Sequence, residues 1–191
     1  MHNLKPITPL GHAAPQEDNV GAFTITEIVD RAMASVTARD GQEKAVAKIL
    51  AEIIGAPAPA AGEWAGSTAK TKSSAFWTSR GQWMVEAPIN THEDITAKLA
   101  PIFKGKASLT EQHDGWCRFE ITGGDLDRLA SLMCNVDMRN FGKGSATRTT
   151  IDHLGCFLTR SSAASLTVLG PRSSAQSLHH AMMVAMKSSV F

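Results

Sequence analysis

The sequence predicts an α+β fold made of two packed split-βαβ units of the ferredoxin-like type. Hydrophobic periodicity indicates the element order strand, helix, strand, strand, helix, strand, and this order approximately recurs after residue 113. The 191 residues are 43% hydrophobic and 19% charged, which is the balance of a globular protein with a full core. We therefore expect residues 23–191 to form a single domain of two pseudo-repeated halves, about 23–113 and 114–191.

Residues 1–22 are predicted to form an extended N-terminal arm. Pro6, Pro9 and Pro15 disfavour a helix here, because proline lacks the backbone N–H that a helix interior requires. The polar composition of the segment argues against its burial. An arm of this kind is either disordered or laid against a partner.

The first half begins with a strand over residues 32–39, followed by an Asp-Gly turn. Apolar residues at helical spacing over 46–54 then predict an amphipathic helix that ends at Gly55. Residues 56–70 are rich in proline, alanine and glycine, and we expect them to form a loop.

The rest of the first half is predicted to complete the unit. Residues 73–88 indicate two strands around a turn. A helix is expected over 91–103, with Thr91 as its N-cap and Asp94 three residues later in a near capping box. Residues 106–112 are the last predicted strand of this half.

The second half opens after Asp114-Gly115, a dipeptide typical of hairpin turns. It is predicted to contain a strand, a helix, three strands and a closing helix, at residues 115–123, 126–134, 146–153, 155–160, 164–170 and 173–188. This order approximately repeats that of the first half, without obvious sequence identity between the two.

Cys117 is a candidate nucleophile, because His113 stands four residues before it. Strand alternation, however, puts Cys117 on the same face as Phe119 and Ile121, which are large apolar residues. A catalytic thiol needs an exposed, electropositive environment. We therefore expect Cys117 to be a core residue, and we predict no catalytic residue in this chain.

Metal and cofactor sites are not predicted either. Cys134 and Cys156 fall in apolar patterns, where a free cysteine behaves as a small hydrophobic residue. His153 and Cys156 are one close pair, whereas a structural zinc site usually needs two. Neither the dinucleotide-binding glycine fingerprint nor the P-loop spacing occurs.

Charge and composition exclude two further classes of partner. The formal net charge is +1, from 19 basic and 18 acidic side chains, with no basic run of the kind that binds nucleic acid. No apolar run approaches the ~20 residues that a membrane span requires.

The three cysteines are far apart in the sequence, which favours a reducing, cytoplasmic compartment.

The segment around Arg172 permits two interpretations. Pro171 and the serines after it are typical of a capped helix start, with Arg172 exposed beside it. A helix start with an adjacent arginine is also suited to an acid group of a ligand or partner. On the residues alone, a binding or structural subunit and a small-ligand enzyme therefore both remain open.

Three long stretches resemble the γ subunits of bacterial heterotetrameric sarcosine oxidases. They are residues 111–123, 132–160 and 170–182, and they occur in the same order as in that family. Shorter matches at 8–10 and 81–88 agree with them. The resemblance implies a fold related to the folate-binding domain of the aminomethyltransferases, which contains split-βαβ units.

The resemblance also implies a role. Such complexes oxidatively demethylate sarcosine to glycine, form hydrogen peroxide, and release formaldehyde or transfer the one-carbon unit to tetrahydrofolate. FAD, FMN, NAD, tetrahydrofolate and zinc are expected in the partner α, β and δ subunits, with no cofactor in this chain. The expected role of this chain is then structural, in assembly, and it is expected to be inactive alone.

An obligate subunit needs contacts with its partners, and arginine forks suit partly buried carboxylates at such contacts. The candidate partner-binding residues are Trp116, Arg118, Arg148, Arg160 and Arg172. One alternative is the γ subunit of a related enzyme such as N-methylglutamate dehydrogenase. Another is a stand-alone folate-binding one-carbon protein, but no acidic residue aligns with the one those transferases use to hold folate.

Overall fold

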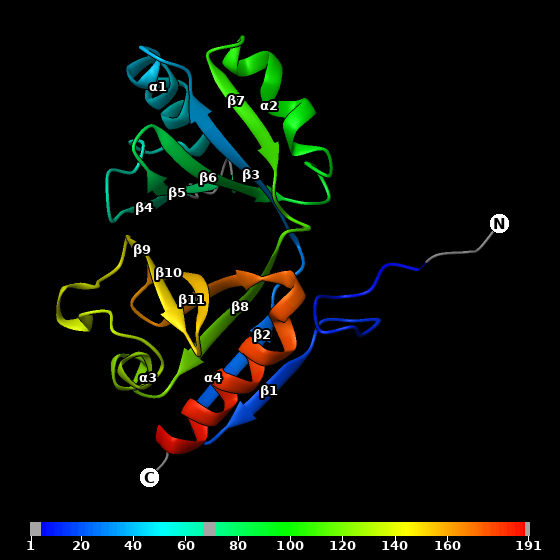
Figure 1. Ribbon diagram of the computed structural model, residues 1–191, viewed down its shortest axis with the longest axis vertical. Coiled ribbons are helices and arrows are strands. Elements are labelled where there is room, and N and C mark those ends of the chain that lie inside the picture. The colour runs from blue at the N-terminus through cyan, green and yellow to red at the C-terminus, as the bar shows by residue number, and fades with distance from the viewer. Residues whose placement is uncertain (1–4, 67–71, 190–191) are drawn as a thin grey trace.

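The protein has two antiparallel sheets, each covered on one face by helices (Figure 1). The computed structural model describes residues 5–66 and 72–189. The strands are β1 (Glu17–Val20), β2 (Phe23–Glu27), β3 (Arg31–Ala38), β4 (Trp64–Gly66), β5 (Ser74–Ser79), β6 (Gln82–Pro88), β7 (Ala107–Glu111), β8 (Trp116–Gly123), β9 (Ser145–Ile151), β10 (Leu154–Ser162) and β11 (Ser165–Pro171). The helices are α1 (Glu43–Ile54), α2 (Ile95–Phe103), α3 (Leu126–Met133) and α4 (Ala175–Ser189), with short 3-10 turns at Met138–Asn140 and Arg172–Ser174. The predicted α+β class is confirmed.

Each sheet contains a split-βαβ unit, as the element order predicts. In the upper sheet of Figure 1 the strand order is β4-β5-β6-β3-β7, so β3 lies between β6 and β7. The lower sheet has the order β1-β2-β8-β11-β10-β9. Read from β9 and from β4, the two orders correspond over five strands, with β2 in the place that β7 takes in the other unit, and β1 is an additional edge strand of the lower sheet. An N-terminal strand therefore completes the C-terminal unit.

The segment before residue 32 has more structure than its pattern predicted. Part of the expected arm, residues 17–20, is strand β1, and residues 23–27 form β2. Strand β2 pairs with β8, although it falls within the first of the two predicted halves. Its side chains alternate between buried and half-buried, which is the strand signal that was missed. The prediction for residues 1–4 lies outside the described residues.

Local signals account for most element ends. Helix α1 ends at Gly55, whose φ of 68° is the left-handed conformation expected of a glycine cap. Helix α2 begins at Ile95, so Thr91 is not its N-cap. The cap is Asp94, whose carboxylate accepts a hydrogen bond of 2.8 Å from the Ala97 N–H. The predicted loop at 56–70 contains strand β4, and its residues 67–70 lie outside the described part.

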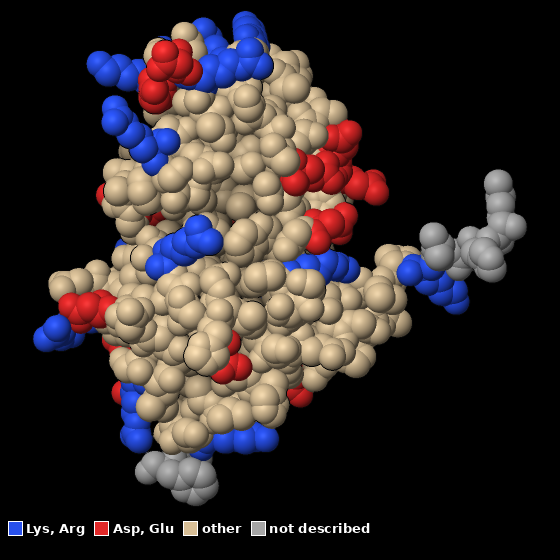
Figure 2. Space-filling model, in the orientation of Figure 1, with Lys and Arg blue, Asp and Glu red and all other residues tan. Residues whose placement is uncertain are grey.

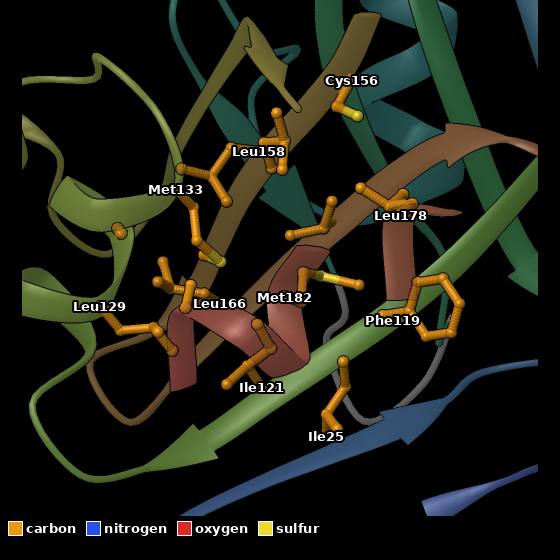
Figure 3. Packing of buried hydrophobic residues seen from close by; sticks show 14 of the residues in the cluster. Ile25, Phe119, Ile121, Leu129, Met133, Cys156, Leu158, Leu166, Leu178 and Met182 are labelled. Atoms are coloured by element: carbon orange, nitrogen blue, oxygen red, sulfur yellow. The ribbon is translucent and has the colours of Figure 1, made fainter. Parts of the chain in front are cut away.

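The core is divided into three layers. The largest lies between α3, α4 and the lower sheet, where Phe119, Ile121 and Leu166 are fully buried (Figure 3). A second packs α1 and α2 on the upper sheet. A third lies between the sheets and includes Phe76 and Phe157, whose ring centroids are 5.2 Å apart. In the described part of the chain, no helix has the length and apolarity needed to cross a membrane.

Gly123 controls how β2 reaches β8, and a substitution there tests this arrangement. It has a φ of 77°, and an added Cβ would lie 2.1 Å from the Ala22 carbonyl oxygen. We expect Gly123→Ala to lower the free energy of unfolding by about 1–3 kcal/mol, from backbone strain and this clash. Urea denaturation measures the loss.

Gly142→Ala is the matched control, because an added Cβ there meets nothing within 4 Å. Its expected effect is within about 0.5 kcal/mol. Equal stabilities of the two variants would contradict the close approach of β2 to β8.

Candidate functional site

A cleft lies where the chain crosses between the two sheets. One crossing, residues 28–30, joins β2 to β3, and the other, residues 112–115, joins β7 to β8. The cleft has a volume of about 490 Å³, and residues from 6 to 15 of the N-terminal arm form one of its walls. We call it the seam cleft. Figure 2 shows acidic and basic side chains close together on the edge of the molecule where the arm leaves the body.

The wall of the seam cleft is largely apolar. Ile7 and Val29 are exposed at its rim, and Ile28 and Trp116 also line it. Its ionisable side chains are Arg31, Glu93, His113, Asp114, Arg118 and Arg172. An apolar cleft with a few converging polar groups is the usual form of a small-molecule site.

A buried ion pair joins the sheets beside the cleft. Arg118 of β8 donates to the carboxylate of Glu86 on β6, which is 1% exposed. The Ser74 hydroxyl also donates to this carboxylate, at 3.0 Å. Burial alone would raise the pKa of Glu86, but the charge and hydrogen bond of Arg118, together with Arg31 and Ser74, hold that pKa below its usual value.

Within the described residues, two arginines of the cleft have hydrogen-bond partners on the backbone alone. Arg31 donates to the Lys72 carbonyl at 3.0 Å, and Arg172 donates to the Ile7 carbonyl at 3.0 Å. Among the described residues, no carboxylate is within ion-pair distance of either guanidinium. Burial lowers the pKa of Arg31, and the nearby charge of Arg118 lowers it further, against the opposing effect of Glu86.

The arm is fixed to the body by a buried acid. The two carboxylate oxygens of Glu27 accept hydrogen bonds from the Leu10 N–H at 2.9 Å and the Gln16 N–H at 3.2 Å. The Leu10 side chain is itself part of the large core. Gln176 of α4 adds a hydrogen bond to the Leu10 carbonyl at 3.4 Å. The arm therefore forms a defined wall of the cleft.

The pairing of Cys117 with His113 does not occur. Cys117 is fully buried, as expected, and its thiol donates to the Gly170 carbonyl at 3.3 Å. Burial raises the pKa of the Cys117 thiol to about 11, so the thiolate is scarce at neutral pH. His113 instead lies 3.2 Å from Glu111 and 3.8 Å from Asp114, measured from its Nε2 atom.

The other predicted core cysteines differ in burial. Cys156 is fully buried, and burial raises the pKa of its thiol to about 11. Cys134 is half-buried at the end of α3 and packs against the core. In the parts of the chain that the structure describes, no group of three or more metal-ligating side chains is placed to hold an ion.

Three of the predicted partner-binding residues meet at the seam. Trp116 packs on Phe157 with ring centroids 5.3 Å apart, and its indole N–H donates to Gln112 at 3.3 Å. Arg118 is held by the ion pair with Glu86, and Arg172 holds the arm. All three line the cleft, so the structure brings them together.

The two remaining arginines lie elsewhere. Arg160 pairs with Asp127 at 2.6 Å and donates to the Phe141 carbonyl at 3.0 Å, which ties α3 to β10. Arg148 is exposed, and its guanidinium carbon lies 5.9 Å from the centroid of the Phe157 ring. Partner binding by the five residues stays a prediction.

Sequence reasoning missed the acids that organise the site. Glu27 and Glu86 are buried at 2% and 1% exposure, each on a strand. Glu27 follows Phe23 and Ile25 at alternate positions, which is the signal that would have placed it on the inner face. Glu86 lies among consecutive buried residues of β6, so the apolar residues around it were the signal for its burial. Nothing local identifies their partners.

Comparison with known proteins finds similar folds among solved structures but no similar sequence. No family model matches the sequence, and no curated protein matches it either. A chain of the heterotetrameric sarcosine oxidase from Corynebacterium sp. U-96, solved in complex with pyrrole 2-carboxylate, is similar in structure with a TM-score of 0.73 and 18% identity. The match covers 91% of this chain and 88% of that one.

A second similar structure is the glycine cleavage system aminomethyltransferase T from Bartonella henselae. Its TM-score is 0.63 at 12% identity, over 86% of this chain. The present chain spans only 46% of that transferase. The two comparisons confirm the fold that the sequence resemblance implied, because a sarcosine oxidase chain and an aminomethyltransferase both share it.

Removing the cation of the buried pair tests its role. We expect Arg118→Met to lower the free energy of unfolding at neutral pH by about 3–5 kcal/mol, because it leaves the buried Glu86 carboxylate without its main partner. The double variant Glu86→Gln with Arg118→Met should regain most of this loss. Urea denaturation of the three proteins gives the comparison.

The pH dependence of the same pair has a defined sign. In the wild type the folded-state pKa of Glu86 is lowered, so its stabilising contribution is complete above the unfolded pKa and is lost as pH falls through the folded pKa. In Arg118→Met, burial should raise that pKa, so lowering the pH from neutral should restore stability. A parallel loss in both proteins on acidification would contradict the assignment.

The anchor of the arm can be removed separately. Glu27→Ala takes away the acceptors of the Leu10 and Gln16 N–H groups, so amide exchange at these two positions should accelerate by about tenfold or more. Hydrogen exchange measures the change. Glu52→Ala, on the exposed face of α1, is the control and should leave the arm protected. Unchanged protection in Glu27→Ala would show that another contact holds the arm.

Proposed function

We propose that this chain is the γ-type, non-catalytic subunit of a heterotetrameric flavin-dependent sarcosine oxidase. The observation that carries the proposal is the structural match to a chain of such an oxidase over 91% of this chain and 88% of that one. The three long stretches of sequence resemblance support the same family.

An assembly role agrees with the chemistry of the chain. The buried thiols Cys117 and Cys156 have raised pKa values, which makes them poor nucleophiles. The buried acid Glu86 is neutralised by Arg118. In this proposal the chain stabilises the complex, and the oxidation of sarcosine to glycine takes place on partner chains that hold the flavins.

Exposed apolar side chains supply surfaces for partner contacts. Ile7, Ile102, Leu132 and Val184 are between 46% and 60% exposed. Leu132 and Val184 lie together in a shallow groove between α3 and α4. Apolar groups gathered on a surface are typical of protein contacts. The proposed partners are the α, β and δ subunits, with FAD, FMN, NAD, tetrahydrofolate and zinc distributed among them.

Affinity purification of the tagged chain from its native host tests the proposal. We expect flavin-containing partner chains to co-purify, with a flavin absorption spectrum and sarcosine-dependent oxygen consumption that forms hydrogen peroxide. The same chain produced alone should be colourless and inactive. Recovery of the chain from native extract as a stable, flavin-free monomer would contradict the subunit role.

The same preparation separates the substrate alternatives. Sarcosine and N-methylglutamate are offered in parallel, because related complexes act on other N-methyl amino acids. Faster oxidation of sarcosine supports the leading proposal. Faster turnover of N-methylglutamate would keep the subunit role and replace the substrate.

A second candidate function is a stand-alone folate-binding one-carbon protein. The likeness to aminomethyltransferase T favours it, because the shared region is most of this chain. Calorimetric titration of the isolated chain with tetrahydrofolate distinguishes the two candidates. Tight one-to-one binding, with no partner recovered from native extract, would favour this second function.

A further inference from the structure

The seam cleft is lined by two arginines, Arg31 and Arg172, that form no ion pair with the described residues, although Glu86 and Asp30 lie near enough to Arg31 to offset part of its charge. Arg31 and Arg172 are half-buried, and in the part of the chain that the structure describes each donates to one backbone carbonyl. The third guanidinium, that of Arg118, is already paired with Glu86. A guanidinium has five N–H donors, so both Arg31 and Arg172 retain donors for a further acceptor. Partial burial strengthens their attraction for an anion.

The acids of the cleft are placed differently from its arginines. Glu93 is exposed, and the side chain of Asp114 is 85% exposed. Water and salt screen such charges, so they offset the half-buried cations only weakly. At the rim they would still repel a ligand that carries several negative charges. The arrangement favours a singly charged anion over a phosphate or a nucleotide.

Size and wall composition define the rest of the ligand. A volume of about 490 Å³ falls within the range of about 300–1,000 Å³ that is usual for small-molecule sites. Val29, Ile28 and Trp116 give the cleft an apolar wall and one aromatic face. Carboxylates suit the planar donor fork of arginine. The apolar wall suits a hydrocarbon or aromatic body attached to that carboxylate.

We propose that the seam cleft binds a small organic monocarboxylic acid. Its carboxylate is held by Arg31 and Arg172, and its apolar body packs against the Trp116 side of the cleft. The site is formed jointly by the arm, the two crossings between the sheets and the 3-10 turn that follows β11. The inference concerns this chain alone and does not depend on the proposed oxidase complex.

The test uses the full chain with benzoate as the probe and benzamide as its neutral counterpart of the same shape. NMR titration follows the indole N–H signal of Trp116, which is assigned by its loss in Trp116→Phe. Benzoate should shift this signal saturably, and benzamide should bind at least about tenfold more weakly, because it lacks the charge. Equal binding of the two probes, or no saturable shift with benzoate, would overturn the proposal.

Variants locate the carboxylate contact. Arg31→Gln and Arg172→Gln should each weaken benzoate binding by about tenfold or more. Arg148→Gln removes an exposed arginine outside the cleft and is the matched control, with unchanged affinity expected. Because Arg172 also contacts the arm, Arg31→Gln is the decisive variant: wild-type affinity in it would overturn the assignment. Failure here would leave the co-purification test of the proposed function unaffected.

Discussion

The pairing of β2 with β8 is the constraint on which the rest of the structure depends. Strand β8 has β11 on one side, and β2 covers its other edge with Ile25 opposite Ile121. Without β2, that edge of β8 would be left without a strand partner. Because β2 belongs to one sheet and β3 to the other, the chain must cross between them within residues 28–30. This crossing lies beside the second one at 112–115, and the seam cleft forms where the two meet.

The ion pair of Glu86 and Arg118 supplies the second constraint, between the sheets. It lies among apolar residues of the third core layer, where a carboxylate without its cation would be costly. A buried pair of this kind does not stabilise a fold more than apolar packing would. Its effect is on geometry, since the carboxylate on β6 keeps its cation when β8 of the other sheet lies beside it. In the same region Arg31 and Arg172 form no ion pair within the described residues, so the proposed anion site lies beside the internal ion pair.

The helices and most strands were predictable because their signals are local. The periodic apolar positions of α1, the glycine at its end and the alternation around Cys117 all act within a few residues. The residues of the candidate site were harder to predict from the sequence. Trp116, Arg118 and Arg172 were selected as outward-facing or helix-start residues, yet they converge at an internal seam. The burial of Glu27 and Glu86 was not predicted. An acidic side chain is rarely buried without a partner, and the partners of both come from other parts of the chain.

The sequence by itself determined the class of the helices and of most strands, the core face of strands such as β8, and the approximate repeat in the order of elements. Periodicity carries this information because it records whether each position meets water or the interior. Only the tertiary structure decided which strand closes the second sheet and which charges meet. Glu86 and Arg118 are 32 residues apart, and Ile7 and Arg172 are 165 apart. A pattern of burial states that a side chain is inside the protein, whereas its partner is chosen by the packing of the whole chain.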